Sequence, residues 1–429
     1  MKNIKRLLAL VVLATMLITL FAGCGTQGVT PAASDSPKAA VDSNKPDAAA
    51  PADSSGPSGD VTIWYYWETE GHQKALNNLM QEFNASQNNI TVQAKYVPFA
   101  DMKKQLSIGA SADELPDLII LDNPDHASFA AMGIFADITG KIDVSTYYPG
   151  PINSCTLDGK LYGVPFGSNC LLLFYNEDML KAAGKTVPKT WDELLDTAKA
   201  CTTDTVSGFA HSSLQNEEGT FNFLPHVWST GASSYEINSA GGIKALTMIK
   251  NLVDAGAMTK EAINWTQGDT MNQFISGNLA MMINGTWQVP TMRSEVPDLK
   301  WNVAPIPMDK QQASGLGGEN YAIISGGNED ATLEFLKFAT QKEQCLGMMH
   351  AMGYISSDST IAEGQFAGDA VYETFVEEMN YAFARGPLPE WPDISDAISL
   401  AFNEVITGAS SPEDAAAKAQ ATIDGIIGK

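Results

Sequence analysis

Hydrophobic positions between residues 60 and 121 switch between a strand-like and a helix-like spacing. Val61–Tyr66 and Ile90–Val97 predict strands, and Asp117–Leu121 (DLIIL) predicts a fully buried one. With a short helix expected from Asp101, the order strand–helix–strand–helix–strand predicts a parallel sheet covered by helices. The first helix follows from apolar residues at i, i+3, i+4 and i+7, namely Leu76, Leu79, Met80 and Phe83.

The middle of the chain predicts a crossing between two domains and further elements beyond it. Leu161–Asn176 (LYGVPFGSNCLLLFYN) carries two apolar runs around Pro165 and Gly167, and we interpret it as the crossing. Thr190 and Glu193 have the spacing of a capping box at the start of a helix. Strands are expected at Leu279–Ile283 and Tyr321–Ile324, and a helix has one apolar face made of Ile243, Leu246, Ile249 and Val253.

The C-terminal third is predicted to be mostly helical, which makes the fold class α/β with a helical tail. Ala331–Met349 forms one helical region in this interpretation. A later helix is expected to end at Gly408, and the last one to begin at Ser411 with Pro412 in its first turn. Two helical faces are marked by apolar residues, namely Val371, Phe375 and Met379, then Ile394, Ile398, Phe402 and Val405.

The N-terminus is typical of a secretory signal. A short basic start precedes the apolar run Leu7–Phe21, which is shorter than the roughly 20 residues of a membrane-spanning helix. Ala22, Gly23 and Cys24 then resemble a bacterial lipobox, although Phe21 stands where Leu is most usual. We therefore expect a signal peptide at 1–23 and lipidation of Cys24, palmitate included; an uncleaved membrane anchor is the alternative.

Composition changes sharply after Cys24. Residues 24–59 are rich in Ala, Pro, Ser, Asp and Gly, which predicts a flexible linker because few apolar side chains are available to bury. A merely disordered N-terminus is the alternative, but it would need no Cys24. The remaining residues, about 370 of them, exceed the roughly 250–300 that one hydrophobic core supports, so two domains are expected.

The charge is strongly acidic. The formal net charge is −24, and removal of 1–23 takes away three positive charges and leaves −27. Such a chain repels nucleic acid and anionic lipid surfaces, so no nucleic-acid partner is expected. Only Arg293 and Arg385 remain as arginines, which disfavours a strongly anionic ligand.

No sequence motif for a metal, a cofactor or a catalytic centre is found. The cysteines after Cys24 lack C-x-x-C or zinc spacing, so one or two disulfides and buried free thiols both stay open: Cys155, Cys170, Cys201 and Cys345. Catalytic residues, metal ligands and cofactors are all predicted to be absent, since G-x-S-x-G, H-E-x-x-H and Walker patterns do not occur.

Several segments, in their order and spacing, resemble the extracellular solute-binding protein family 1, of the maltose-binding type. The resemblance extends over essentially all of 60–429. Its most specific part is a glycine before a strand that ends in Gly-x-Trp. The segments are Pro116–Thr139, Leu161–Pro165 (LYGVP), Tyr175–Asp178, Lys189–Glu193 and Phe274–Trp287 (FISGNLAMMINGTW).

The resemblance implies a two-lobed periplasmic-binding-protein fold (type II), in which each lobe is a mostly parallel sheet flanked by helices. By this analogy the N-terminal lobe comprises 60–168 plus 322–366, and the C-terminal lobe 170–317 plus 370–429. A hinge closes the lobes over a ligand in the cleft between them. The implied role is a membrane-anchored, monomeric lipoprotein that delivers a carbohydrate to the permease subunits of an ABC transporter.

A sugar-binding cleft needs aromatic rings for the C–H faces and polar groups for the hydroxyls. We assign Trp67 and Glu68, after the first strand, to the cleft, and leave Trp64 and Tyr66 to packing. The remaining candidates are residues at loop positions or at positions that the resemblance marks, namely Asp122, Asn123, Asn169, Trp228, Trp287, Gly318, Arg385 and Trp391.

Each candidate has a structural alternative. Trp67 could be an edge-strand aromatic, Asp122 and Asn123 could cap a helix, and Gly318 could serve the hinge. His226 is interpreted as a structural hydrogen-bonding residue. Among other functions, a non-sugar solute (a polyamine, an organophosphate or a peptide) stays open, as do a secreted glycoside hydrolase and an adhesin.

Overall fold

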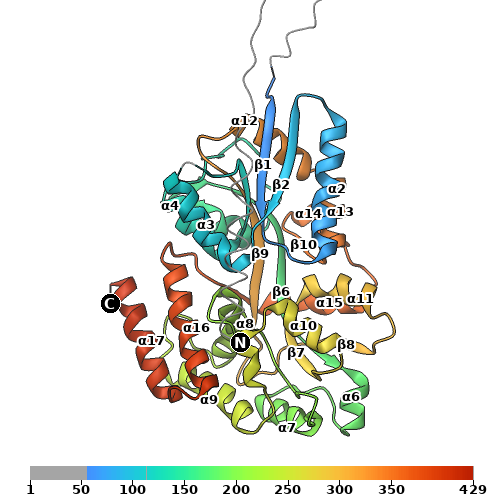
Figure 1. The fold of residues 1–429 in the computed structure, drawn as a ribbon, viewed down its shortest axis with the longest axis vertical. Helices are drawn as coiled ribbons and strands as arrows, with labels where there is room; N and C mark the ends of the chain where they lie inside the picture. Colours follow the sequence, from blue (N-terminus) through green and yellow to red (C-terminus); the bar gives the residue numbers. More distant parts are fainter. Residues whose placement is uncertain (1–55, 113, 429) are drawn as a thin grey trace, which may run out of the picture. The chain divides into compact units, whose positions relative to one another are not determined.

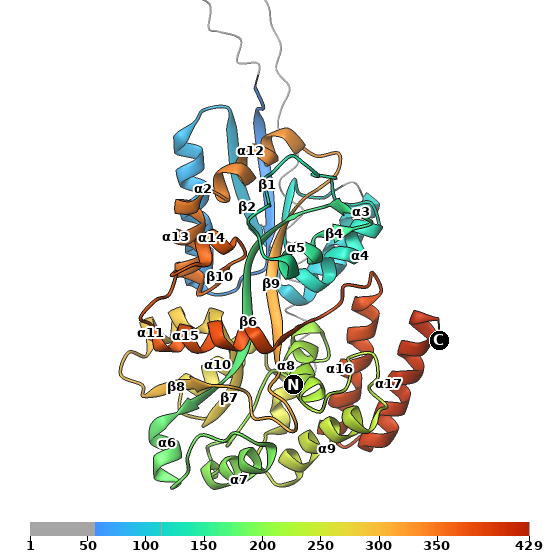
Figure 2. The same ribbon diagram turned by 180° about the vertical axis from the view of Figure 1, so that it is seen from behind.

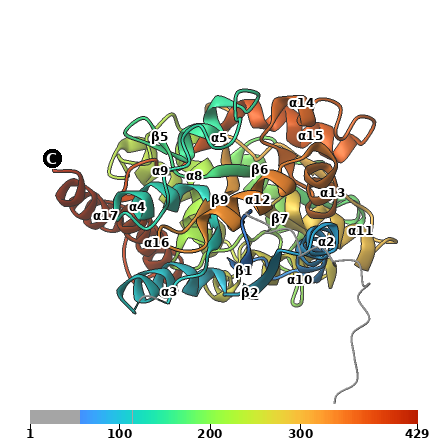
Figure 3. The same ribbon diagram turned by 90° about the horizontal axis from the view of Figure 1, so that it is seen from above.

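The first five elements follow the predicted order. In the computed structural model, which describes residues 56–112 and 114–428, β1 (Gly59–Tyr65) pairs in parallel with both β2 (Ile90–Tyr96) and β3 (Leu118–Asp122). The helices α2 (Glu70–Ser86) and α3 (Phe99–Ala112) lie on opposite sides of β1 (Figure 3). Because both faces of the sheet are covered, all five residues of β3 are buried.

Two long strands connect the two halves of the structure. β6 (Val164–Asn176) pairs antiparallel with β9 (Ser314–Ile323) in its first half and with β7 (Met281–Gly285) and β8 (Trp301–Ala304) in its second. β9 continues antiparallel along β3. Figures 1 and 2 show β6 and β9 running side by side through the molecule. Most of the predicted crossing segment, from Val164 to Asn176, is therefore one continuous strand.

The sheet is mixed, which corrects the expectation of mostly parallel lobes. Its parallel pairs are β1–β2, β1–β3 and the pair of β9 with β11 (Ala382–Ala384). β6 and β9 run in opposite directions along each other, and β7 and β8 both run opposite to β6. The short strands are β10 (Ile355–Ser356), which pairs with β6, and the hairpin of β4 (Thr156–Leu157) with β5 (Lys160–Leu161).

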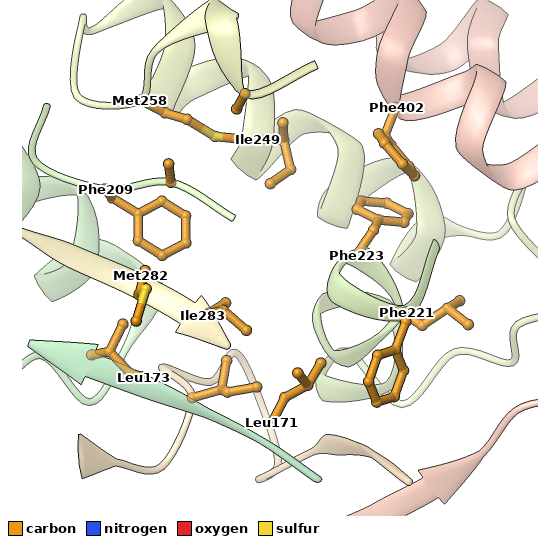
Figure 4. Close-up of a cluster of buried hydrophobic side chains, with 14 of the residues drawn as sticks. Leu171, Leu173, Phe209, Phe221, Phe223, Ile249, Met258, Met282, Ile283 and Phe402 are labelled. Carbon is orange, nitrogen blue, oxygen red and sulfur yellow. The ribbon is translucent and has the colours of Figure 1, made fainter. Parts of the chain in front are cut away.

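The hydrophobic core is divided. Two clusters cover the two faces of the β1–β3 sheet: Ile63 belongs to one and the adjacent Trp64 to the other. A third and larger cluster surrounds the second half of β6 (Figure 4). In this cluster β6 and β7 contribute Leu171, Leu173, Met282 and Ile283, and the surrounding helices contribute Phe223, Ile249 and Phe402. Separate cores of this kind agree with a chain too long for a single one.

Local signals for helix boundaries are largely confirmed. The capping box at the start of α7 (Trp191–Cys201) has both hydrogen bonds, from Thr190 and from Glu193. α16 (Trp391–Thr407) ends at Gly408 with φ +81°, and α17 (Pro412–Ile427) begins after Ser411. The other helices of the second half of the chain are α8 (Glu217–Ser229), α9 (Ala240–Asp254), α10 (Gln267–Ile275), α11 (Val289–Glu295) and α15 (Ala370–Glu378).

The single helical region expected at 331–349 is wrong, because two helices occupy it. α12 (Glu329–Ala339) ends where the Thr340 hydroxyl donates back to the Leu336 carbonyl, and Gln341 turns to extended backbone before α13 (Lys342–Met352). Four shorter helices complete the fold, namely α4 (His126–Ala131), α5 (Pro149–Ser154), α6 (Glu177–Ala182) and α14 (Ser359–Ala362).

Some of the predictions fall outside the described residues. The signal peptide, Cys24 and most of the linker lie there, and β1 begins at Gly59, one residue before the expected boundary. Within the described residues the cysteines are free thiols, which resolves the disulfide alternatives: Cys155, Cys170, Cys201 and Cys345. Among these same residues, every helix falls short of the length and apolar character that a membrane crossing requires.

Candidate functional site

A cavity lies beside the paired region of β6 and β9, and we call it the central cavity. The space between its side chains, including the part open to solvent, is about 730 Å³. Its lining comes from the segment after β1, from β3, β6 and β9, and from the starts of α8 and α10. The residues are Tyr66, Trp67, Glu68, Thr69, His72, Phe99, Asp122, Asn169, Glu217, Glu218, Phe221, Gln267, Trp287, Gln288, Gly317, Gly318, Glu319, Tyr354 and Arg385.

Trp287 is a half-buried aromatic side chain of the cavity. It follows β7 in a single 3-10 turn (Thr286–Gln288), and its ring stacks on Phe221 at 6.2 Å between centroids with 23° between the planes. The indole folds back over Gly285, where a Cβ would lie 1.9 Å from ring atom Cζ3. Gly285 is therefore required for this orientation, which explains the Gly-x-Trp motif physically.

Glycines of β9 bring its backbone close to the cavity. A Cβ at Gly315 would meet the Phe221 ring at 2.4 Å, and one at Gly317 would meet Oδ1 of Asn169 at 2.2 Å. Gly318 has φ +145°, a conformation that other residues rarely adopt. β9 can therefore pass between β6 and α8 only with bare backbone at these positions.

Glu319 is a buried carboxyl held by two phenols. Its Oε1 accepts hydrogen bonds from the hydroxyls of Tyr66 (2.9 Å) and Tyr354 (2.8 Å). Burial, and then the nearby charge of Asp122, raise the pKa of Glu319 to about 8, although the hydrogen bonds oppose this. Glu319 is therefore mostly protonated at neutral pH, and its Oε2 has no hydrogen-bond partner among the described residues.

Arg385 forms ion pairs with two carboxylates that lie on different parts of the fold. Its Nη1 and Nη2 donate to the two oxygens of Asp122 at 2.9 and 3.0 Å, and Nη1 also donates to Glu217 at 2.7 Å. The guanidinium lies 4.0 Å from the centroid of the Phe221 ring. Because Asp122 ends β3 and Glu217 begins α8, the ion pairs connect the β1–β3 sheet to the helices beyond the crossing.

A second pair of carboxylates lies at the start of α10. The Glu218 Oε2 accepts from the backbone N–H of Gln267 (3.0 Å) and from the Ser212 hydroxyl (3.3 Å). Burial is the main factor that raises the pKa of Glu218, to about 7. The hydrogen bond from the Gln267 N–H opposes this rise, and the charge of Glu68 adds to it. Glu68 comes close enough that a Cβ on Gly268 would lie 2.4 Å from its Oε1.

Six buried polar atoms of the cavity lining have no hydrogen-bond partner among the described residues. Such atoms are rare in folded proteins, because leaving one unpaired costs roughly 1–3 kcal/mol. One of them belongs to His72, whose pKa burial lowers to about 4, so that its ring is neutral. The six are Trp67 Nε1, His72 Nε2, Asn169 Oδ1, Gln288 Oε1, Glu319 Oε2 and Arg385 Nε.

Seven of the ten residues predicted for the cleft line the central cavity together. They come from six separate stretches of the chain, and the guanidinium of Arg385 pairs with two carboxylates. The seven are Trp67, Glu68, Asp122, Asn169, Trp287, Gly318 and Arg385.

The structure places the other three residues away from the cavity. Asn123 begins the 3-10 turn after β3 and does not contribute to the lining. Trp228, at the far end of α8, is buried and stacks on Phe383 at 5.3 Å. Trp391 is fully buried, and its indole N–H donates to Glu217 at 3.1 and 3.2 Å, so it orients a lining residue instead.

Sequence reasoning missed several lining residues. Tyr66 was assigned to packing, yet it lines the cavity and donates to Glu319. Glu217 and Glu218 follow Asn216, whose side chain caps α8, and two acids after such a cap are typical of any helix start. Other missed residues with polar or aromatic side chains are Thr69, His72, Phe99, Phe221, Gln267, Gln288, Glu319 and Tyr354.

Residues 78–374, more than half of the chain, match the family model described as bacterial extracellular solute-binding protein. The chain belongs to this family. The expected family is thereby confirmed, and membership places the working location of this solute-binding protein outside the cytoplasm.

Relatives of the chain carry the names of binding proteins rather than enzymes. A putative binding protein of Brucella abortus is 25% identical over 372 residues, 81% of this chain and 89% of that one. The lactose-binding protein of Rhizobium radiobacter is 24% identical over 400 residues, 84% and 91% of the two chains.

A solved structure has the same fold. It is an ABC transporter solute-binding protein of Thermotoga lettingae bound with alpha-D-tagatose. It superposes with a TM-score of 0.80 at 25% identity and covers 86% of this chain and 100% of that one. The two-lobed α/β fold expected from the sequence is confirmed by this likeness; the residue boundaries assigned to the lobes stay a prediction.

Proposed function

We propose that this protein is the substrate-binding component of an ABC importer and that it binds a mono- or oligosaccharide in the central cavity. The observation that carries the proposal is the combination of a stacked aromatic platform with unpaired buried polar atoms in one cavity. Trp287 offers its ring to the C–H face of a sugar, and such ring contacts contribute about 0.5–1.5 kcal/mol beyond burial.

The unpaired atoms suit hydroxyl groups. Trp67 Nε1 and Arg385 Nε can donate, whereas Asn169 Oδ1 and Gln288 Oε1 can accept. A hydroxyl both donates and accepts, so a polyol can satisfy both kinds at once. An inorganic anion would meet an acceptor-rich lining in which the guanidinium of Arg385 is already paired.

The names of the relatives support a sugar. The Rhizobium radiobacter relative is named for lactose, and the Thermotoga lettingae structure holds tagatose. The acidic lining also suits a cation, so polyamines are the non-sugar ligands that a test has to include.

A thermal-shift screen of the full-length protein followed by calorimetry tests the proposal. The panel contains mono- and oligosaccharides, polyamines, peptides and organophosphates, and a ligand that binds the native state raises the Tm. We expect one sugar class to raise it and to be recovered unchanged by chromatography. A shift with a polyamine alone would overturn the sugar assignment, and a cleaved glycoside would make the protein a hydrolase.

Replacement of Trp287 by Ala sharpens the same test. We expect about tenfold weaker binding of that sugar, which corresponds to roughly 1.4 kcal/mol, with an unchanged far-UV spectrum. Trp301→Phe is the control, because Trp301 stacks on Phe174 outside the cavity. Equal affinity of Trp287→Ala and the parent protein would sink the stacking assignment.

We further propose that β6 and β9 form the hinge and that the permease subunits recognise the closed lobes. The proposed lobes are 60–168 plus 322–366 and 170–317 plus 370–429. The lipid anchor at Cys24 belongs to this proposal, since it would hold the protein near its permease. Mass spectrometry of the protein from membranes checks it: the mature chain should begin at acylated Cys24, and Cys24→Ser should abolish both cleavage and acylation.

A further inference from the structure

The carboxylates at the start of α10 form an acidic corner, which we define as Glu68, Glu218 and Asp269. The Glu218 carboxylate accepts the first backbone N–H of α10, that of Gln267. Glu68 approaches the next residue, Gly268. Asp269 accepts from the backbone N–H and the hydroxyl of Thr266, both at 3.0 Å, and so closes the capping box of α10. Glu68 and Glu218 are the members that line the central cavity.

Glu68 and Glu218 lack a positive partner. No salt bridge among the described residues involves either of them, whereas Arg385, the arginine of the cavity, is paired with Asp122 and Glu217. Lys74 lines the groove next to the corner but makes no ion pair with it within 4.0 Å. In the described residues no set of three or more His, Cys, Asp or Glu side chains is arranged to hold a metal ion. Within the described residues, Glu68 and Glu218 therefore form no ion pair and belong to no cluster of metal ligands.

A buried side chain with one unpaired ring nitrogen lines the same two hollows as Glu68. His72 lines both the central cavity and the adjoining groove, as Glu68 does. It is 3% exposed, and its Nε2 has no hydrogen-bond partner among the described residues. Burial and the charge of Asp269 also raise the pKa of Glu68. The acids of the corner therefore repel one another, and a bound cation would relieve this repulsion.

We propose that the bound sugar carries a positively charged amino group and that the acidic corner binds this group at Glu68 and Glu218. The inference rests on the proposed function and narrows its substrate class to amino sugars. A primary ammonium has three N–H donors and no acceptor, which suits two carboxylates that offer free oxygens. A hydroxyl at the same position would leave their charges uncompensated, and an N-acetyl group would bring a methyl against them.

Calorimetry of the full-length protein at pH 7.5 with matched sugars tests the inference. The probes are the gluco, galacto and manno monosaccharides and their β-linked disaccharides, each in hydroxyl, amino and N-acetyl form. We expect the amino form of one series to bind about tenfold tighter than its hydroxyl and N-acetyl forms. In the Glu68→Gln, Glu218→Gln double variant, the ratio of the affinities for the amino and hydroxyl forms should fall to about one.

The controls separate this inference from the proposed function. Glu82→Gln removes an exposed acid of α2 that lies outside the cavity, and it should keep the preference. If a hydroxyl or N-acetyl sugar binds as well as every amino sugar, the inference fails and the proposed function stands. If no sugar of the panel binds, both fail. A double variant that retains the preference with a Tm near that of the parent protein would overturn the inference.

Discussion

The central cavity contains two sets of acidic side chains, and only one of them forms ion pairs among the described residues. At one side Asp122 and Glu217 both pair with Arg385, which donates three hydrogen bonds to them. At the other side Glu68 lies close enough to raise the pKa of Glu218, and neither acid forms a salt bridge within the described residues. The charged groups of the Arg385 cluster are therefore paired within the chain, although Arg385 Nε lacks a partner among the described residues. The acidic corner has no such pairing among these residues, and this difference separates a structural bridge from a candidate for ligand recognition.

Replacement of Arg385 by Met should have the largest effect on stability. It would leave Asp122 and Glu217 as buried acids without a cation, and breaking one member of a buried ion pair costs about 3–5 kcal/mol. We expect a strongly lowered Tm in thermal unfolding. Arg293→Met is the matched control, because Arg293 pairs with Asp369 at a half-exposed site, where a pair contributes about 0–1 kcal/mol. Equal losses in the two variants would contradict the structural role of the Arg385 cluster.

The next effect concerns binding rather than stability. Gly285→Ala would place a Cβ within the Trp287 ring, so the indole has to leave its position on Phe221 while all other cavity residues remain. We expect about tenfold weaker binding of the sugar found in the screen, measured by calorimetry. Gly347→Ala in α13 is the control, because a Cβ there meets nothing within 4 Å. Unchanged affinity in Gly285→Ala would show that the Trp287 ring does not contact the ligand.

The same contrast explains what the sequence could predict. The capping box at Thr190, the end of α16 at Gly408 and the apolar face of α2 depend on residues within one or two turns, and all are confirmed. Trp287 could be recognised because Gly285 stands two residues before it. Features that depend on neighbouring residues in this way can be predicted from the sequence without tertiary information.

The acids of the cavity depend on partners far along the chain. Tyr66 meets Glu319 across 253 residues, and Arg385 meets Asp122 across 263. A local pattern carries no information about such a meeting, and in a chain with 50 acidic residues Glu218 looks like any acid of a first helical turn. Arg385 lines the central cavity, as predicted. Its pairing with Asp122 and Glu217, which leaves less of the guanidinium for a ligand, could not be inferred from the local sequence.

Glu319 predicts a pH dependence of stability. Its pKa in the folded protein, about 8, lies above the ordinary value of 4.5, so the folded state holds the extra proton between these values. The contribution is fully present below about pH 4.5 and is lost as the pH rises through 8. We expect the Tm to fall over this range and the fall to be smaller in Glu319→Gln, measured by calorimetric scans from pH 4.5 to 8.5. A variant with the same slope as the parent protein would contradict this assignment.

The smallest effect should come from Glu218→Gln in the absence of ligand. An amide oxygen can still accept the N–H of Gln267, while the repulsion from Glu68 disappears. We therefore expect the Tm at pH 8 to stay unchanged or to rise slightly, within the roughly 0.5 kcal/mol typical of changes outside a packed core. Thermal scans at pH 5 and pH 8 provide the measurement, since the advantage of Gln should vanish where Glu218 is protonated. A marked loss at pH 8 would mean that the Glu218 charge stabilises the fold as the Arg385 cluster does, and the two sides of the cavity would no longer differ.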